Sequence, residues 1–181
     1  DGDCATITQE GTYVITGSLS NGKIVVDADD SAKIQLVLAG VDINCESSAA
    51  IYVKNANKVF ITLAEKSENV LSNSSDFVAT DDNNIDSVVF SKSDLSFNGN
   101  GSLTVNAAYG HGIVSKDDLV FTAGAYSITS ADHGLQGKNS IRIANGTFNI
   151  KCTEDGLHSE NKDDSSKGFV YIIGGTLNIS A

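Results

Sequence analysis

"GSLTV" at residues 101–105, "GAYSI" at 124–128, "GTFNI" at 146–150 and "GTLNI" at 175–179 repeat one five-residue pattern. Each begins with glycine, places a large apolar residue third, and ends on Val or Ile. The four glycines are 23, 22 and 29 residues apart. Alternation of apolar and polar residues is typical of a β-strand, and its return at a nearly fixed interval is typical of stacked repeats. The pattern therefore predicts a repeating β structure.

Two further segments recur between these motifs. "GIVSK", "GLQGK" and "GLHSE" begin at Gly112, Gly134 and Gly156, 22 residues apart, and each is followed by a short apolar segment. Three short strands with three turns fill about 22 residues, and connections between parallel strands favour the right hand. We therefore expect an all-β, right-handed, three-stranded parallel β-helix. Three columns should point inward: Ile113, Leu135, Leu157; Leu119, Ile141, Val170; and Ile128, Ile150, Ile179.

The repeat extends towards the N-terminus. "AIYVK" at 50–54, "VVFSK" at 88–92 and "GTYVI" at 11–15 fit the same columns. The pattern is interrupted by a polar stretch near 64–87 and by "NKDDSSKG" at 161–168, which accounts for the 29-residue interval. We expect one domain over residues 1–181 with these two loop insertions.

Composition limits the classes of partner. There are 23 acidic residues against 12 basic ones, giving a formal net charge of −11, so nucleic acid is an unsuitable partner. Apolar runs stay well below the roughly 18 residues of a membrane-spanning helix, so no membrane insertion is expected. The three cysteines lack the Cys-x-x-Cys spacing of zinc sites, and whether Cys4 and Cys45 form a disulfide stays open.

The stretches "GTYVITGSLSNGKIVVDADDSAKIQLVLAGVDI", "AAIYVKNANKVFITLAE", "GHGIVSKDDL" and "EDGLHSENKDDSSKGFVYIIGGTLNIS" resemble a bacterial carbohydrate-binding domain family. Its members are calcium-binding, pectate-lyase-like right-handed β-helices. The resemblance implies a secreted or cell-surface protein that binds cellulose or acidic, pectin-like glycans without cleaving them. The family usually continues with further Asp-Asp-Gly repeats.

A polar pair before the repeated glycines suggests a metal site. The period places Asp132 beneath Glu154 and His133 beneath Asp155, and stacked carboxylates repel each other unless a cation lies between them. Hard oxygen ligands suit Ca²⁺, whereas the alternative is a solvated acidic turn. His111 and His133 share a column, where a structural or solvent-facing role is expected. The predicted calcium ligands are Asp132, Glu154, Asp155, Glu160, Asp163 and Asp164.

Aromatic and basic residues supply candidates for sugar binding. Exposed rings can stack on sugars, and a row of lysines recurs one residue after the first strand of each repeat. The alternatives are that the rings pack against turns and that the lysines pair with nearby aspartates. The predicted carbohydrate-binding residues are Tyr52, Tyr109, Tyr171, Lys92, Lys116 and Lys138.

Two other functions remain as alternatives to non-catalytic polysaccharide binding. One is a structural or adhesive surface protein whose copies stack head to tail into filaments, joined by the edges at "DGD" and "SA". The other is a pectate-lyase-like enzyme, which needs Ca²⁺ and a base, commonly Arg. Arg142 has no acidic neighbour at a fixed spacing, so lyase chemistry is disfavoured.

Overall fold

The computed structural model describes residues 3–74, 77–78 and 81–181, and within these ranges the chain forms nineteen β-strands. In the same ranges, no helix is long and apolar enough to cross a membrane. A seven-stranded sheet has the order β1 (Asp3–Ile7), β3 (Gly22–Asp27), β5 (Ile51–Asn55), β8 (Ser87–Ser91), β11 (His111–Ser115), β14 (Leu135–Gly137), β17 (Leu157–His158).

The second sheet contains twelve parallel strands, and the two strands at the ends of its order both come from the C-terminal part of the chain. β2 (Gly11–Leu19) belongs to it through its pairing with β4. The order of the other strands is β18 (Phe169–Ile172), β15 (Ser140–Ile143), β12 (Asp118–Phe121), β9 (Asp94–Gly99), β6 (Lys58–Leu63), β4 (Lys33–Cys45), β7 (Glu68–Asn73), β10 (Ser102–Ala107), β13 (Ala125–Ser130), β16 (Thr147–Lys151), β19 (Thr176–Ser180).

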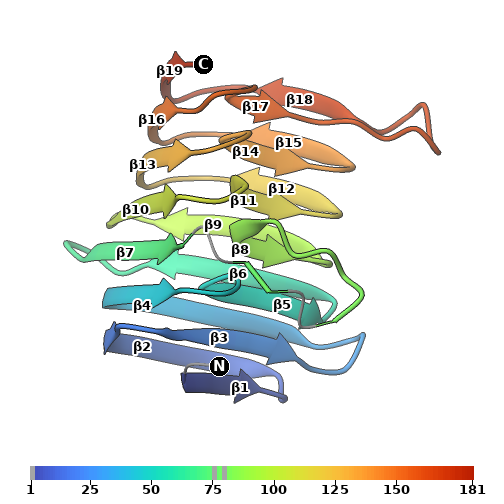
Figure 1. Cartoon of the computed structure of the whole chain (residues 1–181). Helices are drawn as coiled ribbons and strands as arrows, with labels where there is room; N and C mark the ends of the chain where they lie inside the picture. The colour runs from blue at the N-terminus through green and yellow to red at the C-terminus, as the bar shows by residue number, and fades with distance from the viewer. Residues whose placement is uncertain (1–2, 75–76, 79–80) are drawn as a thin grey trace.

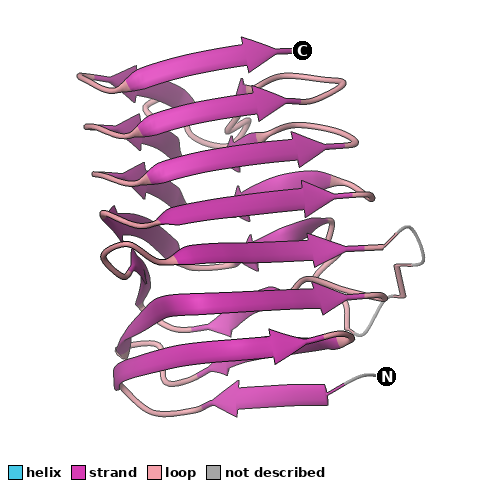
Figure 2. Cartoon of the chain, turned by 90° about the vertical axis from the view of Figure 1, so that its left-hand side faces the viewer, coloured by secondary structure: helices cyan, strands magenta, loops and turns pink. Residues whose placement is uncertain are grey.

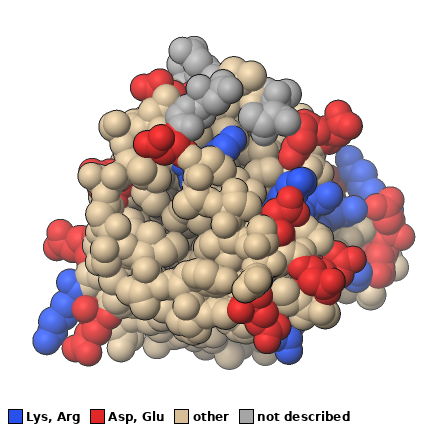
Figure 3. All heavy atoms as spheres, turned by 90° about the horizontal axis from the view of Figure 1, so that it is seen from below, with Lys and Arg blue, Asp and Glu red and all other residues tan. Residues whose placement is uncertain are grey.

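Successive repeats stack in one column, with the chain ends at opposite ends of it (Figure 1). The strands of each repeat lie above those of the one before (Figure 2). Seen from the N-terminal end, charged side chains are spread around the outline and the centre is mostly uncharged (Figure 3). The registers confirm the alignment of the three expected columns, although Val170 and Ile179, in the last repeat, are exposed: Ile113, Leu135, Leu157; Leu119, Ile141, Val170; and Ile128, Ile150, Ile179.

The expected right-handed three-stranded parallel β-helix of 22-residue rungs is wrong. The structure has two large parallel sheets, because β4 runs unbroken for 13 residues and pairs with β6 through its first half and with β7 through its second. The corner falls within the strand at Gly40, whose φ of +88° is accessible to glycine and strained for other residues. The polar turn residues that separate strands in later repeats are missing here. The 22-residue interval holds from β11 to β17 and becomes 29 residues at β18 and β19, whereas Lys33 pairs with Lys58 and Asp42 with Val70.

The core is filled by the inward side chains of both sheets. In the C-terminal half, four fully buried rings stack through successive repeats. Phe97 lies parallel to Phe121 at 4.9 Å between ring centroids, and Tyr126 lies parallel to Phe148 at 4.8 Å. Burial of large aromatic rings supplies much of the apolar area that stabilises stacked repeats, since a single repeat has no core of its own.

The first predicted insertion, 64–87, is too long at its start because it contains β7. The alternation of β7 was missed because Asn69 and Asn73 take inward positions and are buried together with Leu71. Part of the remaining insertion, residues 75–76 and 79–80, lies outside the described residues. The second predicted insertion, 161–168, is a loop between β17 and β18.

Two expectations concern the N-terminal region. Cys4 is exposed, Cys45 is buried, and both are free thiols, so the disulfide left open by the sequence is absent from the described residues. The predicted head-to-tail contact involves Asp1 and Gly2, which lie outside the described residues, and it stays a prediction.

Candidate functional site

Three histidine rings stack in a column beside the neighbouring strands β11, β14 and β17 of the seven-stranded sheet. His111 begins β11, His133 precedes β14, and His158 ends β17. The ring centroids of the first two lie 5.0 Å apart and those of the last two 4.1 Å apart, with 7° between the planes in both pairs. The 22-residue period predicts the first pair. It does not predict the third ring, because His158 comes three residues after the column position held by Asp155.

Backbone amides fix the orientation of the first two rings. The His133 N–H donates to Nδ1 of His111 at 3.1 Å, and the Asp155 N–H donates to Nδ1 of His133 at 3.0 Å. Since both Nδ1 atoms accept hydrogen bonds, the proton of each neutral ring is on Nε2. Nε2 of His133 lies 3.1 Å from a carboxylate oxygen of Glu154. Burial, the largest cause, lowers the pKa of His111, so this ring stays neutral near pH 7.

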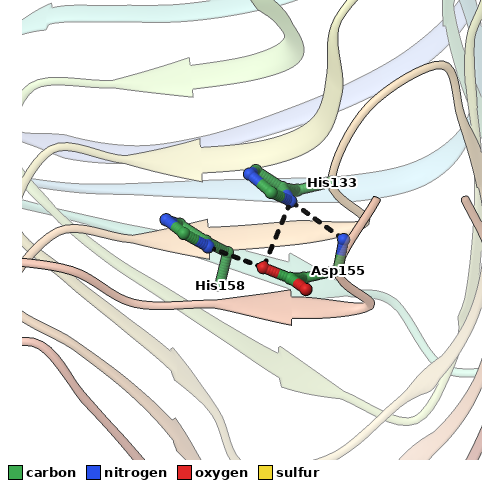
Figure 4. Close-up of side chains that lie close together, drawn as sticks. All are labelled: His133, Asp155 and His158. Carbon is green, nitrogen blue, oxygen red and sulfur yellow. Dashed lines mark hydrogen bonds and ion pairs between the residues drawn. The ribbon is translucent and has the colours of Figure 1, made fainter. Parts of the chain in front are cut away.

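Asp155 connects the second and third rings (Figure 4). Its Oδ2 atom lies 2.8 Å from Nδ1 of His158 and 3.7 Å from Nδ1 of His133. The hydrogen bond from His158 is the main reason that the pKa of Asp155 falls below its usual value. The Asp155 side chain is 62% exposed, whereas the two rings are largely covered. The arrangement is an open cluster of two imidazole nitrogens and one carboxylate.

The structure does not bring the six predicted calcium ligands together. Within the described part of the chain, Asp155 alone of the six belongs to a group of three possible ligands, and its two partners are histidines. Calcium prefers oxygen ligands, so this donor set does not fit it. The other five are engaged elsewhere: Glu154 faces His133, Glu160 pairs with Lys162, Asp163 with Lys138 and Asp164 with Lys167, and the charge of Asp132 acts on His111.

An all-oxygen group lies on the twelve-stranded sheet. The carboxylates of Asp94, Asp117 and Asp118 come within 4.8 Å of one another at the starts of β9 and β12. Burial and then the charge of Asp117 raise the pKa of Asp94. Two positively charged side chains already lie beside this group, since Lys58 is 3.7 Å from Asp94 and Arg142 is 3.8 Å from Asp118.

Arg142 therefore has an acidic neighbour, contrary to the sequence-based expectation. The period did not reveal it because Ser140, not Arg142, is opposite Asp118 in the register. The guanidinium also lies over the ring of Phe169, at 5.5 Å from the centroid. Both contacts hold the guanidinium on the twelve-stranded sheet.

Two of the predicted lysines, Lys116 and Lys138, line a hollow of about 320 Å³ on the outer side of β11 and β14, whereas Lys92 is not among its lining residues. Ser91, Ser115 and Gly137 are in register, so Lys92, Lys116 and Lys138 follow them in one row. The hollow is lined by Ser115, Lys116, Gln136, Lys138, Glu160, Lys162 and Asp163.

Gln136 was missed by the sequence analysis. Its Oε1 atom is buried and has no hydrogen-bond partner among the described residues. In the register it continues an outward column through Tyr52, Phe90 and Val114, which is apolar up to this point. The change from apolar residues to glutamine in that column is the signal that marks the position.

The three predicted tyrosines lie on different parts of the surface. Tyr52 is 3% exposed, and its hydroxyl donates to Asp81 at 2.6 Å, so the prediction of an exposed sugar-stacking ring is wrong there. Burial also raises the pKa of its phenol. Tyr109 is 43% exposed but stacks on Phe77 at 4.7 Å, and Tyr171 is 56% exposed on β18. None of the three lines the hollow beside the lysines.

Comparison with known proteins agrees with a sugar-related role. The model of the family described as carbohydrate-binding domain-containing protein matches residues 1–181. A protein of that description from Acetivibrio thermocellus is 48% identical over 177 residues, which are 97% of this chain and 62% of the relative. The chain thus spans less than two thirds of that relative's length. A solved structure described as the polysaccharide lyase-like protein from C. thermocellum, gadolinium derivative, is 37% identical, with a TM-score of 0.95, over 98% of this chain and 72% of that one.

Proposed function

The chain belongs to the family of carbohydrate-binding domain-containing proteins, and we propose that it binds a polysaccharide outside the cell without cleaving it. The observation that carries the proposal is the hollow around Gln136, with lysines on two successive repeats beside it. Its volume of about 320 Å³ lies at the lower end of the range for ligand pockets.

The polar groups of the hollow suit a sugar. Gln136 lines the hollow, and a turn of its side chain brings Oε1, which is buried and has no hydrogen-bond partner among the described residues, to the hollow as an acceptor. A sugar hydroxyl supplies such a donor, while the ammonium groups of Lys116 and Lys138 donate to sugar oxygens or carboxylates. These side chains stand on strands β11 and β14 or directly after them, so the backbone holds their spacing rigid.

The charge around the hollow is mixed. Lys138 lies 3.2 Å from Asp163, Lys162 lies 3.4 Å from Glu160 and Lys116 lies 3.5 Å from Asp86, so all three lysines of the hollow already have acidic partners. A neutral, hydroxyl-rich chain such as cellulose leaves these pairs intact, whereas an acidic, pectin-like chain competes with Asp163 and Glu160 for the lysines. Both classes belong to the proposal, and their salt dependence separates them, because screening weakens the charged contact alone.

Calcium remains part of the proposal as a stabilising ion. The group that suits its oxygen preference is Asp94, Asp117 and Asp118, rather than the six residues expected from sequence. The raised pKa of Asp94 reflects burial together with like-charge repulsion, which a cation would relieve.

Lyase activity is the second candidate because the similar solved structure is described as polysaccharide lyase-like. Elimination needs a base near the sugar carbon that carries the proton. Arg142 is held by Asp118 and Phe169, and it is not among the residues lining the hollow. Incubation with polygalacturonate should therefore give no unsaturated product in ultraviolet absorbance, and steady product formation would favour the enzyme.

Binding is tested by titrating the protein with soluble oligosaccharides derived from cellulose and from pectin. Gln136→Leu and Lys116→Ala should each weaken the wild-type affinity by about tenfold, which is within the range for the loss of one hydrogen bond. Lys66→Ala is the matched control, since this lysine is exposed and lines a different corner. Equal affinity of wild type and both variants for every bound sugar would contradict the assignment of the hollow.

A further inference from the structure

We infer that His133, Asp155 and His158 form a binding site for a d-block divalent cation such as Zn²⁺. Imidazole nitrogens suit zinc, copper and nickel, whereas calcium and magnesium select oxygen ligands. The donor set here is two nitrogens and one carboxylate oxygen. The chemistry therefore differs from that of the calcium site expected around Asp155.

The three ligand atoms face one another. Figure 4 shows Nδ1 of both rings directed at the same carboxylate, with Oδ2 at 2.8 Å from one and 3.7 Å from the other. Zinc bonds of about 2.0–2.2 Å in a tetrahedral arrangement place neighbouring ligand atoms roughly 3.3 Å apart. The separations in the protein lie on either side of this value, so small side-chain movements are enough to enclose an ion.

The surroundings of His133 are those of a metal ligand. Its Nε2 lies 3.1 Å from the Glu154 carboxylate, which holds the proton on Nε2 and leaves Nδ1 for coordination. Metal-binding histidines commonly donate their other N–H to a carboxylate in this way. The backbone N–H of His133 donates to His111, which fixes the segment before β14 against the preceding repeat.

Binding requires two local exchanges. The ion replaces the Asp155 N–H as the partner of His133 Nδ1, and the proton of His158 moves from Nδ1 to Nε2. Asp155 is 62% exposed, so the ion has an entry path and a solvent-facing fourth position for water. The bound ion joins the segments before β14 and around β17, and so it clamps two successive repeats together.

The test is calorimetric titration of the whole chain with Zn²⁺ alone and with Ca²⁺ alone. A Cys4→Ser background is used, because this exposed thiol is a potential zinc ligand. We expect one Zn²⁺ per chain, with Ca²⁺ failing to displace it at equal concentration. His158→Gln and Asp155→Asn should each weaken Zn²⁺ binding by at least tenfold.

Asp163→Asn is the matched control. It removes a nearby exposed carboxylate outside the cluster, so the Zn²⁺ affinity should stay within about twofold if general attraction to acidic groups plays no part. Co²⁺ provides a spectroscopic readout, since its visible absorption reports nitrogen and oxygen ligands. Circular dichroism confirms that each variant is folded. Absence of Zn²⁺ binding, unchanged affinity in His158→Gln, or equal competition by Ca²⁺ would each overturn the inference.

Discussion

Asn69 offers the most quantitative test of how the repeats are joined. It is 1% exposed and lies on β7, where its Oδ1 accepts the N–H groups of Gly40 and Val41 at 3.0 and 3.2 Å. Its amide group donates to Ser67 and to the Ser102 carbonyl at 2.9 and 3.0 Å. One side chain thus holds the corner of β4 and the neighbouring strand β10.

Asn69→Ala removes all four hydrogen bonds and leaves the buried Val41 N–H without a partner. A buried unsatisfied group costs about 1–3 kcal/mol, so with the lost bonds we expect a decrease of about 2–4 kcal/mol in the free energy of unfolding. For a chain of this size, each kcal/mol lowers the melting temperature by roughly 2–4 °C, which gives about 4–16 °C in total.

Urea unfolding followed by circular dichroism measures this change. The control is Asn149→Ala, because this exposed residue makes one side-chain hydrogen bond, with Asn178 at 2.9 Å, and should stay within about 0.5 kcal/mol of wild type. If Asn69→Ala were as stable as the control, the corner would not depend on the buried amide, and the account of how β4 joins the sheet would fail.

The remaining predictions concern charge and backbone. Asp94→Asn should raise the melting temperature at pH 7 without added metal: burial and Asp117 raise the pKa of Asp94, so its ionisation destabilises the fold as pH rises, and unchanged or lower stability would contradict this. Burial raises the pKa of Asp81, but its hydrogen bonds, chiefly that from Tyr52, lower the pKa by a larger amount, so the net shift is downward. The stability that Asp81 contributes should therefore be lost as pH falls below about 4. Tyr52→Phe should flatten this pH dependence in urea titrations at several pH values. Gly99→Ala should reduce the folded yield, since φ is +91° and a Cβ would press on the backbone of β6; normal yield and melting would refute it.

Regular columns were predictable because their physical cause is local. A large apolar residue such as Ile113, Leu135 or Leu157 returns after 22 residues and points inward at each return. The same counting placed Lys116 and Lys138 in one row. Repetition of residue type is visible in a single sequence, since stacked repeats present the same environment at each level.

The corners were harder to predict. In β4, one glycine bends the strand without the polar residues that normally mark a turn, so the number of sheets was wrong. In β7, Asn69 occupies an inward position that apolar patterning assigns to a hydrophobic residue. Both depend on hydrogen bonds to distant parts of the chain, which sequence periodicity does not contain.

The six calcium ligands predicted from the sequence do not come together in the structure, for a related reason. Counting in steps of 22 placed Asp155 above His133, which the structure confirms through the hydrogen bond between them. The counting gave no reason to place His158 beside His133, although the two rings stack with 4.1 Å between their centroids. It also overlooked that Asp163 and Glu160 are ion-paired with lysines. Spacing gives the level of a residue in the stack, whereas side-chain direction decides its partners.

The central claim, binding without cleavage, is tested most directly by one co-sedimentation measurement with insoluble cellulose and calcium-gelled pectin. The protein remaining in the supernatant and the chain length of the polysaccharide are followed together over time. We predict that the protein is depleted by at least one of the two polysaccharides while chain length stays constant. Protein that remains fully in solution with both, or chains that shorten during incubation, would contradict the account.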